Sequence, residues 1–306
     1  MGYGSYSYES HQNITQARSN QSRSEVFKQS KVHPLMNPLG VGMRESRDSL
    51  EHPNSIPIVF ALDVTGSMGE IPEQLARKEL PHFMKTLLDS GVADPQVLFM
   101  FVGDAAHDSG PLQVGQFESA AEDMDRWLTW SWLEGGGGGN GCESYDLAMY
   151  FAARHTDTDS VSKRAKRGYF FMTGDENPYP TVSQTWVRDL IGDDLTADVP
   201  LEQICEELAR AYRPFFLVPD KGRLDRCGSA WAKVFGDHVI AMENSEDTCL
   251  TAASLVALCE GADLDEVARR LIRDKVPKAR VNRIVGSLRA FASTLAPLPV
   301  LEPVMP

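Results

Sequence analysis

From about residue 55 onward, hydrophobic residues alternate between strand-like and helix-like patterns. Three continuous apolar runs, in 56–64, 97–104 and 167–175, are typical of strands that are buried on both faces of a sheet. Two shorter runs, in 213–219 and 237–243, are further strand candidates. Because helical segments lie between these runs, we predict an α/β fold with a doubly wound, mostly parallel sheet that helices cover on both faces.

Helices are predicted where apolar residues repeat every three or four positions. The repeat is clear in 80–87, and the segments 145–153, 201–212 and 230–235 also have helical patterns.

Beyond residue 245 the sequence predicts only helices. One covers 248–259, and two amphipathic helices follow, around 264–272 and 281–288. Pro277 separates the last two, which indicates a helical hairpin.

The same patterns divide the chain into four parts. Residues 1–54 are rich in Ser, Gln, Asn, Tyr and Arg and predict a flexible polar arm, of which 33–43 has enough apolar residues to lie extended against the domain. We expect the α/β domain at 55–245 and a helical extension at 246–296. A Pro-rich tail, 297–306, follows.

Composition restricts the class of protein. In a chain of 306 residues, 42% hydrophobic residues are enough to form a core, so extensive disorder is excluded. The formal net charge of −13 argues against general nucleic-acid binding, which depends on Lys and Arg that neutralise phosphates. The five cysteines are scattered without a Cys-x-x-Cys pair, which favours a reducing compartment. Since the sequence has neither a secretory signal nor an apolar run of about 18 residues, we expect a cytoplasmic protein without membrane contact.

Each of the three long strand candidates ends in a carboxylate: Asp63, Asp104 or Asp175. Ligands of doubly wound folds bind outside the carboxyl ends of the strands, so these side chains are expected at one edge of the sheet. Carboxylates that gather there repel one another unless a cation lies between them. A divalent metal ion is therefore the simplest explanation.

The loop after the first strand candidate supports this interpretation. Asp63, Thr65 and Ser67 stand at alternate positions, and in a tight loop such side chains can converge on one point. Their hard oxygen atoms suit Mg²⁺, Mn²⁺ or Ca²⁺. The alternative is a structural role, in which Thr65 and Ser67 only cap the following helix.

At this loop the sequence resembles the von Willebrand factor A (VWA) domains and their metal-ion-dependent adhesion site (MIDAS). The first motif of that family is Asp-x-Ser/Thr-x-Ser, often with Gly-Ser-Met at its end, and 63–68 reads Asp-Val-Thr-Gly-Ser-Met. The resemblance covers about 56–244 and implies a Rossmann-like VWA fold of the intracellular bacterial or phage type.

The other two motif elements depart from the family pattern. Where the family has a metal-facing Thr at the start of a later helix, the resemblance places Glu143, just after the glycines of 135–139. Glu143 is alternatively a first-turn residue that the helix dipole favours. The family's Thr-Asp-Gly is replaced by Thr-Gly-Asp at 173–175, so Asp175 would act through water, or Glu176 would take its place. The implied metal ligands are Asp63, Thr65, Ser67, Glu143 and Asp175.

The resemblance also implies a function. It predicts a non-enzymatic module for protein–protein interaction, in which an Asp or Glu of a partner protein completes the coordination of the ion. Proteins of this type often work beside AAA+ ATPases of the MoxR class, so such an ATPase is a candidate partner.

Two other functions stay open. Metal-dependent phosphohydrolases of the haloacid-dehalogenase-like type also carry an Asp at the end of a central strand, but they need a second Asp where this chain has Thr65. A structural or assembly protein with a vestigial metal site is the third hypothesis.

Two further charged groups have open interpretations. Asp104, His107 and Asp108 are either a second set of hard ligands or an ordinary polar loop. The predicted hairpin is basic, and it is a solvated surface, a docking surface for an acidic protein or, as the least favoured alternative, a nucleic-acid contact. Its basic residues are Arg269, Arg270, Arg273, Lys275, Lys278, Arg280, Arg283 and Arg289.

Overall fold

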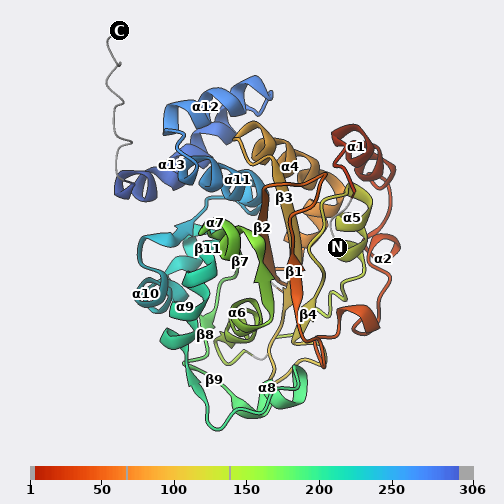
Figure 1. Cartoon of the computed structure of the whole chain (residues 1–306). Coiled ribbons are helices and arrows are strands. Elements are labelled where there is room, and N and C mark those ends of the chain that lie inside the picture. The colour runs from red at the N-terminus through yellow and green to blue at the C-terminus, as the bar shows by residue number, and fades with distance from the viewer. Residues whose placement is uncertain (1–3, 67, 138, 296–306) are drawn as a thin grey trace.

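A six-stranded sheet forms the centre of the computed structural model, which describes residues 4–66, 68–137 and 139–295 (Figure 1). The strand order is β12-β11-β7-β2-β3-β4. Neighbouring strands are parallel, except that the edge strand β4 is antiparallel to β3. The strands are β2 (Ser55–Asp63), β3 (Asp94–Val102), β4 (Leu112–Val114), β7 (Gly168–Thr173), β11 (Tyr212–Val218) and β12 (Val239–Ala241).

Numbered along the chain, the six strands of this sheet have the order 6-5-4-1-2-3, which is the strand order of doubly wound folds. The predicted α/β fold class is confirmed, and each of the five predicted strands corresponds to a strand of this sheet. The apolar runs are strands because β2 and β3 are buried along all nine of their residues.

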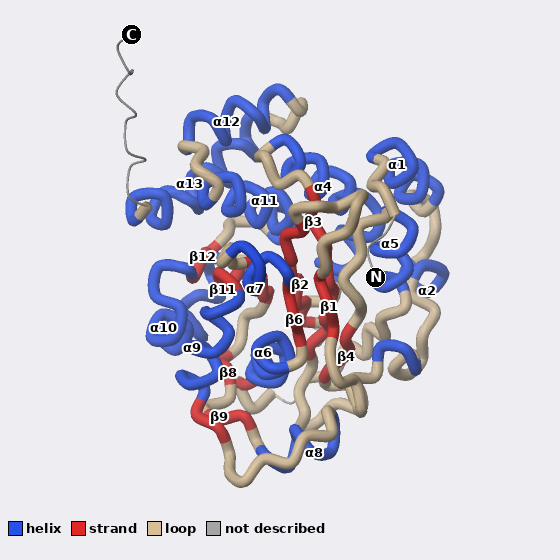
Figure 2. The backbone as a smooth tube through the Cα atoms, in the orientation of Figure 1, coloured by secondary structure: helices blue, strands red, loops and turns tan. Residues whose placement is uncertain are grey.

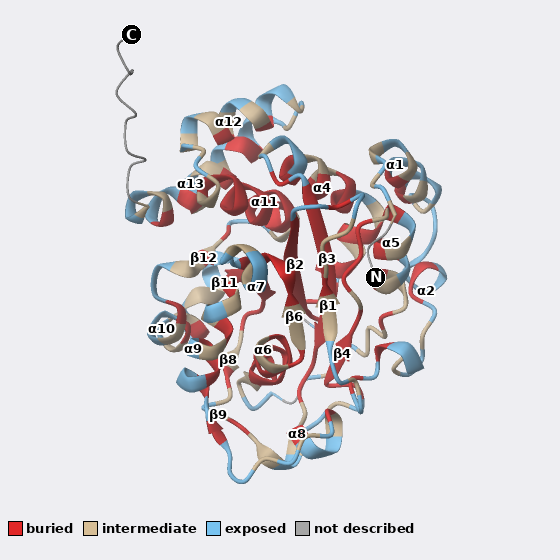
Figure 3. Ribbon diagram, viewed as in Figure 1, coloured by how far each residue is buried: buried red, intermediate tan, exposed pale blue. Residues whose placement is uncertain are grey.

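The sheet lies between two hydrophobic cores, because alternate side chains of a strand point to opposite faces. In β2, Phe60 and Leu62 belong to one core, whereas Val59 and Ala61 belong to the other. Figure 3 shows that the helices bury the sides that they turn toward the sheet.

Different helices cover the two faces of the sheet (Figure 2). The core that contains Phe60 includes residues of α3 (Glu70–Gln74), α4 (Leu80–Asp89), α5 (Ala121–Thr129), α11 (Thr248–Cys259), α12 (Leu264–Arg273) and α13 (Lys278–Thr294). The core that contains Val59 includes residues of α6 (Tyr145–Arg154), α8 (Gln184–Leu190), α9 (Leu201–Ala211) and α10 (Leu224–Phe235).

Short elements connect these layers. A π-helical turn, Leu75–Glu79, joins α3 to α4, and 3₁₀ turns cover Pro34–Met36, Lys221–Arg223, Gly236–His238 and Ser245–Asp247. The remaining elements are α1 (Tyr8–Ala17), α2 (Arg23–Val26), β1 (Arg44–Ser46), β5 (Cys142–Glu143), β6 (Thr156–Thr158), α7 (Asp159–Arg164), β8 (Asn177–Pro178), β9 (Thr181–Val182) and β10 (Val199–Pro200).

Residues 4–54 differ from the flexible arm that their composition predicts. Helix α1 packs against α4 and α5, and strand β1 pairs with β6. Val26, Phe27 and Met36 are buried in the core, which is the physical reason that this polar segment stays on the domain. The tail at 297–306, for which the sequence predicts an extended path, lies outside the described residues.

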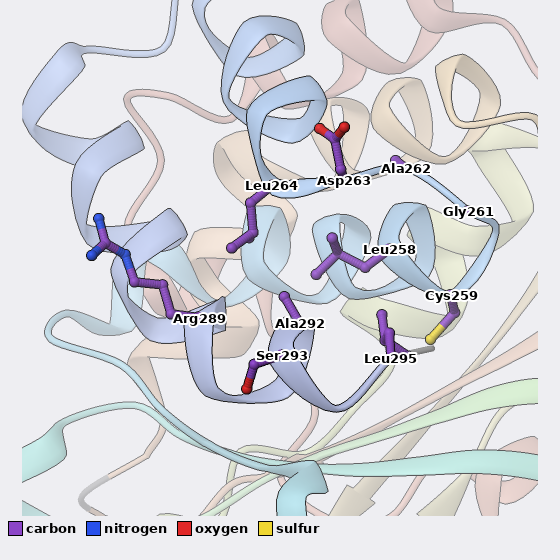
Figure 4. Close-up of a pocket in the computed structure, with 10 residues that line it drawn as sticks. All are labelled: Leu258, Cys259, Gly261, Ala262, Asp263, Leu264, Arg289, Ala292, Ser293 and Leu295. Atoms are coloured by element: carbon purple, nitrogen blue, oxygen red, sulfur yellow. The ribbon is translucent and has the colours of Figure 1, made fainter. Parts of the chain in front are cut away.

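The predicted C-terminal helices are confirmed. Helix α11 has the predicted bounds, and α12 and α13 form a hairpin with Pro277 at the N-terminal cap of α13. A hollow of about 650 Å³ opens between the three helices, lined largely by apolar side chains such as Leu258, Leu264 and Leu295 (Figure 4).

Part of the positive charge of this hairpin is paired within the molecule. Arg280 is buried and lies 3.0 Å from Glu79 and 2.9 Å from Asp247. Arg283 contacts the same Asp247 at 2.8 Å. Arg273 lies 3.0 Å from Asp89 of α4. These pairs attach the hairpin to the α/β domain, so the charge available to a partner is smaller than the sequence suggests.

No helix in the described part of the chain is long and apolar enough to cross a membrane. All five cysteines are free thiols.

Candidate functional site

The candidate site lies where strands β2 and β7 end side by side. From β2 the chain continues to β3 on one side, and from β7 it continues to β11 on the other, so the connections diverge at this point. Leu62 and Thr173 are partners in the register of the two strands, and the Thr173 hydroxyl accepts a hydrogen bond from the Asp63 N–H at 3.3 Å. This is the topological switch point, at which doubly wound folds bind ligands.

Asp63 is fully buried at this edge and is held by two side chains. Its Oδ1 accepts hydrogen bonds from the backbone N–H of Thr65 at 2.8 Å and from the Thr65 hydroxyl at 2.6 Å. Its Oδ2 accepts a hydrogen bond from the Tyr145 hydroxyl at 2.6 Å. The pKa of Asp63 is raised to about 7, mainly by burial and also by the negative charge of Asp175, while the hydrogen bonds from Thr65 and Tyr145 oppose the shift.

Glu143 lies beside Thr65, on the short strand β5. A Cβ atom on Gly137 would lie 3.1 Å from Glu143 Oε1 and 3.4 Å from Thr65 Cβ, so Gly137 packs against both residues. Glycine also suits the backbone here, because Gly137 has a φ of 106°. The glycine-rich loop therefore approaches the site closely.

The Glu143 carboxyl has little around it that would stabilise a negative charge. The residue is only 4% exposed, and Oε2 has no hydrogen-bond partner among the described residues. Burial raises the pKa of Glu143 to about 9, with a further contribution from the negative charges of Asp63, Asp104 and Asp108. A cation near this carboxyl would relieve both effects.

Asp175 lies at the same edge, but its carboxylate contacts an arginine. The residue is 1% exposed, and its Oδ2 lies 2.7 Å from Nη1 of Arg223. The next residue, Glu176, is partly exposed and lies 3.9 Å from Arg226. The structure therefore places Asp175 in a salt bridge.

The sequence-predicted ligands are thus brought together to different degrees. Asp63 and Thr65 are in direct contact, Glu143 lies next to Thr65, and Asp175 is at the same sheet edge in its pair with Arg223. Ser67 lies outside the described residues.

The donor set fits a hard divalent ion in part. Within 4–66, 68–137 and 139–295, no group of three or more His, Cys, Asp or Glu side chains is placed to hold a metal ion. Asp63 and Thr65 nevertheless bring a carboxyl and a hydroxyl group together, the Glu143 carboxyl lies next to Thr65, and Glu143 Oε2 is a buried atom in need of a partner. These are the oxygen donors that Mg²⁺, Mn²⁺ and Ca²⁺ prefer.

The second predicted cluster is a hydrogen-bonded loop. Asp104 is fully buried and accepts a hydrogen bond from the Tyr179 hydroxyl at 2.8 Å, and His107 Nδ1 lies 2.6 Å from its Oδ2. Asp108 accepts hydrogen bonds from the backbone N–H groups of Asp104 at 2.7 Å and Gly137 at 2.9 Å. This arrangement supports the interpretation as a polar loop, which also anchors the glycine-rich segment.

Three residues near the site escaped the sequence prediction. Tyr145 donates to Asp63, Arg223 pairs with Asp175, and Asp146 is a buried acid whose two carboxylate oxygens have no hydrogen-bond partner in the described part of the chain. Burial raises the pKa of Asp146 well above its ordinary value, and Asp104 adds to the shift. The only sequence signal for Tyr145 and Asp146 is their position in the first turn of the helix that follows Glu143.

The hollow of about 650 Å³ lies away from these carboxylates. It lies between α11, α12 and α13, and Glu260, next to it, accepts a hydrogen bond from Tyr169 near the start of β7. The carboxylates lie at the other end of β7. A smaller hollow of about 260 Å³ adjoins the candidate site and is lined by Met68, Glu70 and Arg223, among others.

Comparison with solved structures finds distant similarities. The chain is similar to proximal thread matrix protein 1 from the mussel byssus, with a TM-score of 0.40 and 12% identity over 70% of this chain and 48% of that protein. It is also similar to the pilus adhesin SpaC from Lactobacillus rhamnosus GG, in two structures. The open conformation has a TM-score of 0.45 and 8% identity over 74% of this chain and 31% of that protein. The other has a TM-score of 0.46 and 9% identity over 70% of this chain and 32% of that protein.

The aligned part is thus less than half of each of these proteins. No protein-family description and no curated protein matches the chain.

Proposed function

We propose that this chain is a non-catalytic protein-interaction module of the VWA type. In this proposal a divalent cation at the switch point binds an Asp or Glu of a partner protein. The supporting observation is a pair of buried carboxyls, Asp63 and Glu143. Asp63 accepts a hydrogen bond from the Thr65 hydroxyl, Glu143 lies next to Thr65, and Glu143 Oε2 has no hydrogen-bond partner among the described residues. Buried carboxylates are costly unless a cation or a proton compensates them, and they are common where proteins bind metals.

The proposed ligands are Asp63, Thr65 and Ser67, with Glu143 and Asp175 in supporting positions. When bound, Mg²⁺, Mn²⁺ or Ca²⁺ would supply a positive, Lewis-acidic position for a carboxylate oxygen of the partner.

The residues around these ligands have separate tasks. Tyr145 orients Asp63 through the hydrogen bond to Oδ2, which leaves less freedom for the carboxylate to turn. Gly137 lets the backbone of the loop approach Thr65 and Glu143. The negative charge of Glu143 would strengthen retention of an ion and weaken its attraction for the carboxylate of the partner.

The proposed partner is a protein that presents an acidic side chain. A MoxR-type AAA+ ATPase is a narrower proposal, which is supported only by the resemblance of residues 63–68 to the VWA motif. A gene for such an ATPase next to the gene for this protein would support it.

A pull-down tests the proposed function. The purified chain, immobilised in Mg²⁺, is expected to retain a partner that is released by EDTA and that does not bind to the Asp63→Ala variant. A Glu122→Gln variant, which removes an exposed carboxylate of α5 away from the candidate site, serves as the control and should bind as the wild type does. Retention of every partner without metal, and by Asp63→Ala, would contradict the proposal.

A metal-independent assembly protein is the second candidate function. It is favoured by the hydrogen bonds from Thr65 and Tyr145, which satisfy both carboxylate oxygens of Asp63 without an ion. The metal content of the purified protein separates the two candidates, because a vestigial site stays empty at millimolar Mg²⁺. The phosphohydrolase hypothesis has less support, since Thr65 donates to Asp63 and cannot act as a carboxylic acid.

A further inference from the structure

The Asp175 salt bridge connects the buried edge of the sheet to the surface. Asp175 is buried, whereas the Arg223 side chain is 30% exposed, and Arg223 Nη1 lies 2.7 Å from Asp175 Oδ2. The same Nη1 lies 3.8 Å from the sulfur of Met68, in the loop that carries Asp63 and Thr65. Arg223 therefore bridges two of the loops that form the candidate site.

The position of Arg223 is set by a well-defined backbone turn. Asp220 caps the 3₁₀ turn Lys221–Arg223 by accepting a hydrogen bond from the Gly222 N–H at 2.8 Å. The backbone N–H of Lys221 donates to the Met242 carbonyl at 2.6 Å, which ties the turn to the end of β12. The guanidinium is thus presented on a long side chain from a backbone turn that is held in place.

We infer that Arg223 is an internal cation that competes with a divalent ion for the Asp175 carboxylate and thereby lowers the metal affinity of the site. This inference rests on the proposed function. A divalent ion beside Asp63 and Glu143 attracts the Asp175 carboxylate and repels the guanidinium, so the salt bridge and the ion oppose each other. Arg223 also lines the hollow of about 260 Å³, into which the guanidinium can turn when Asp175 moves toward an ion.

Competition from Arg223 accounts for the position of Asp175 in the Thr-Gly-Asp sequence at 173–175. With Gly174 before it, Asp175 stands one position later than the Asp of the family pattern, and the structure places it against Arg223. Gly174 itself packs against the ring of Tyr145, where a Cβ atom would lie 2.3 Å from the Tyr145 hydroxyl oxygen. The order Gly-Asp therefore accommodates Tyr145 and directs the carboxylate to the arginine.

Mn²⁺ binding, measured by electron paramagnetic resonance of the free ion, tests this inference on the full-length protein. Arg223→Gln removes the competing charge and is expected to bind Mn²⁺ about tenfold more tightly than the wild type. Arg223→Lys keeps the charge and should stay within about threefold of the wild type. The matched control is Lys221→Gln, which removes a charge from the same turn, where Lys221 is 64% exposed and lies 3.0 Å from Glu243. Its affinity should change by less than about twofold, because solvent screens an exposed charge.

Thermal unfolding provides the second readout. Without metal, Arg223→Gln should melt at a lower temperature than the wild type, because Asp175 loses its salt-bridge partner at a buried position. Saturating Mn²⁺ should close that gap. A merely structural arginine predicts the lower melting temperature without tighter Mn²⁺ binding.

The outcomes separate this inference from the proposed function. If the wild type binds Mn²⁺ and a folded Arg223→Gln binds it equally or more weakly, the inference is wrong and the proposed metal site stands. If Arg223→Gln does not fold, the Mn²⁺ affinity of Arg223→Lys is compared with that of Lys221→Gln. A Mn²⁺ affinity of Arg223→Lys that is lower by tenfold or more would show that the arginine assists ion binding. That result would overturn the inference. If neither the wild type nor Arg223→Gln binds Mn²⁺ at millimolar concentration, the proposed function is contradicted and the inference falls with it.

Discussion

Replacement of Glu143 by glutamine should change the pH dependence of stability. Glu143 has an ordinary pKa of 4.5 that the folded protein raises to about 9. A raised carboxyl pKa means that the folded state holds a proton that the unfolded state has released. The stabilising contribution is therefore complete below the ordinary pKa and is lost as the pH rises toward 9.

The magnitude follows from proton linkage. One proton held only by the folded state changes the free energy of unfolding by about 1.4 kcal/mol per pH unit. Between pH 5.5 and 7.5 this sets a limit of about 2.7 kcal/mol for Glu143. Asp63, whose pKa is raised to about 7, titrates over the same range and is coupled to Glu143, so the two carboxyls share the effect and we expect ~1–2 kcal/mol from Glu143. The amide that replaces the carboxyl in Glu143→Gln cannot titrate, so this variant should lack the loss.

Urea unfolding of metal-free protein at the two pH values measures the effect. The free energy of unfolding should fall from pH 5.5 to 7.5 by ~1–2 kcal/mol more in the wild type than in Glu143→Gln. Glu70→Gln is the control, because Glu70 is an exposed glutamate of α3, and it should behave as the wild type does. Equal pH dependence of the wild type and Glu143→Gln would refute the interpretation of Glu143 as a buried, uncompensated acid.

Three other substitutions test the contacts that shape the site and the hairpin. Tyr145→Phe removes a hydrogen bond to buried Asp63 and should cost ~1–3 kcal/mol of stability in urea unfolding. An unchanged stability would mean that another donor replaces the Tyr145 hydroxyl. Arg280→Ala removes the buried arginine that pairs with Glu79 and leaves Asp247 with Arg283 alone, so it should cost ~3–5 kcal/mol. The exposed Arg269→Ala should cost less than ~0.5 kcal/mol. Similar costs for the two variants would show that the buried pairs do not hold the hairpin. Gly137→Ala places a Cβ atom on a residue with a φ of 106° and against the Glu143 carboxyl. Thermal unfolding should therefore show a loss of stability of ~1–3 kcal/mol. An unchanged stability would indicate that the loop moves freely.

The sheet could be predicted from the sequence because its strands are buried on both faces. Such strands appear as continuous apolar runs, and the runs that contain β2, β3 and β7 each lead into an aspartate. The doubly wound topology then places those carboxyl ends at one edge. The position of Asp63 at this edge follows from the pattern, whereas its hydrogen bonds from Thr65 do not, because the sequence predicts that both side chains face a cation.

Other features depend on contacts between distant parts of the chain. Arg223 is 48 residues from Asp175 in sequence, and no spacing rule connects an arginine in a loop with an acid after another strand. The same holds for the N-terminal residues, where a few apolar side chains such as Met36 anchor a segment that is polar by composition. The burial of Glu143 depends on the path of the glycine-rich loop, which composition does not determine.

Isothermal titration calorimetry of Mg²⁺ binding tests the central claim most directly. At pH 7.5 the wild-type chain should bind one Mg²⁺ ion, and Asp63→Ala, with its fold verified by circular dichroism, should bind none. Glu122→Gln, which removes an exposed carboxylate of α5 away from the site, should bind the ion as the wild type does. Absence of binding to the wild type at millimolar Mg²⁺, or equal binding to Asp63→Ala, would contradict a metal-dependent interaction site at the ends of β2 and β7.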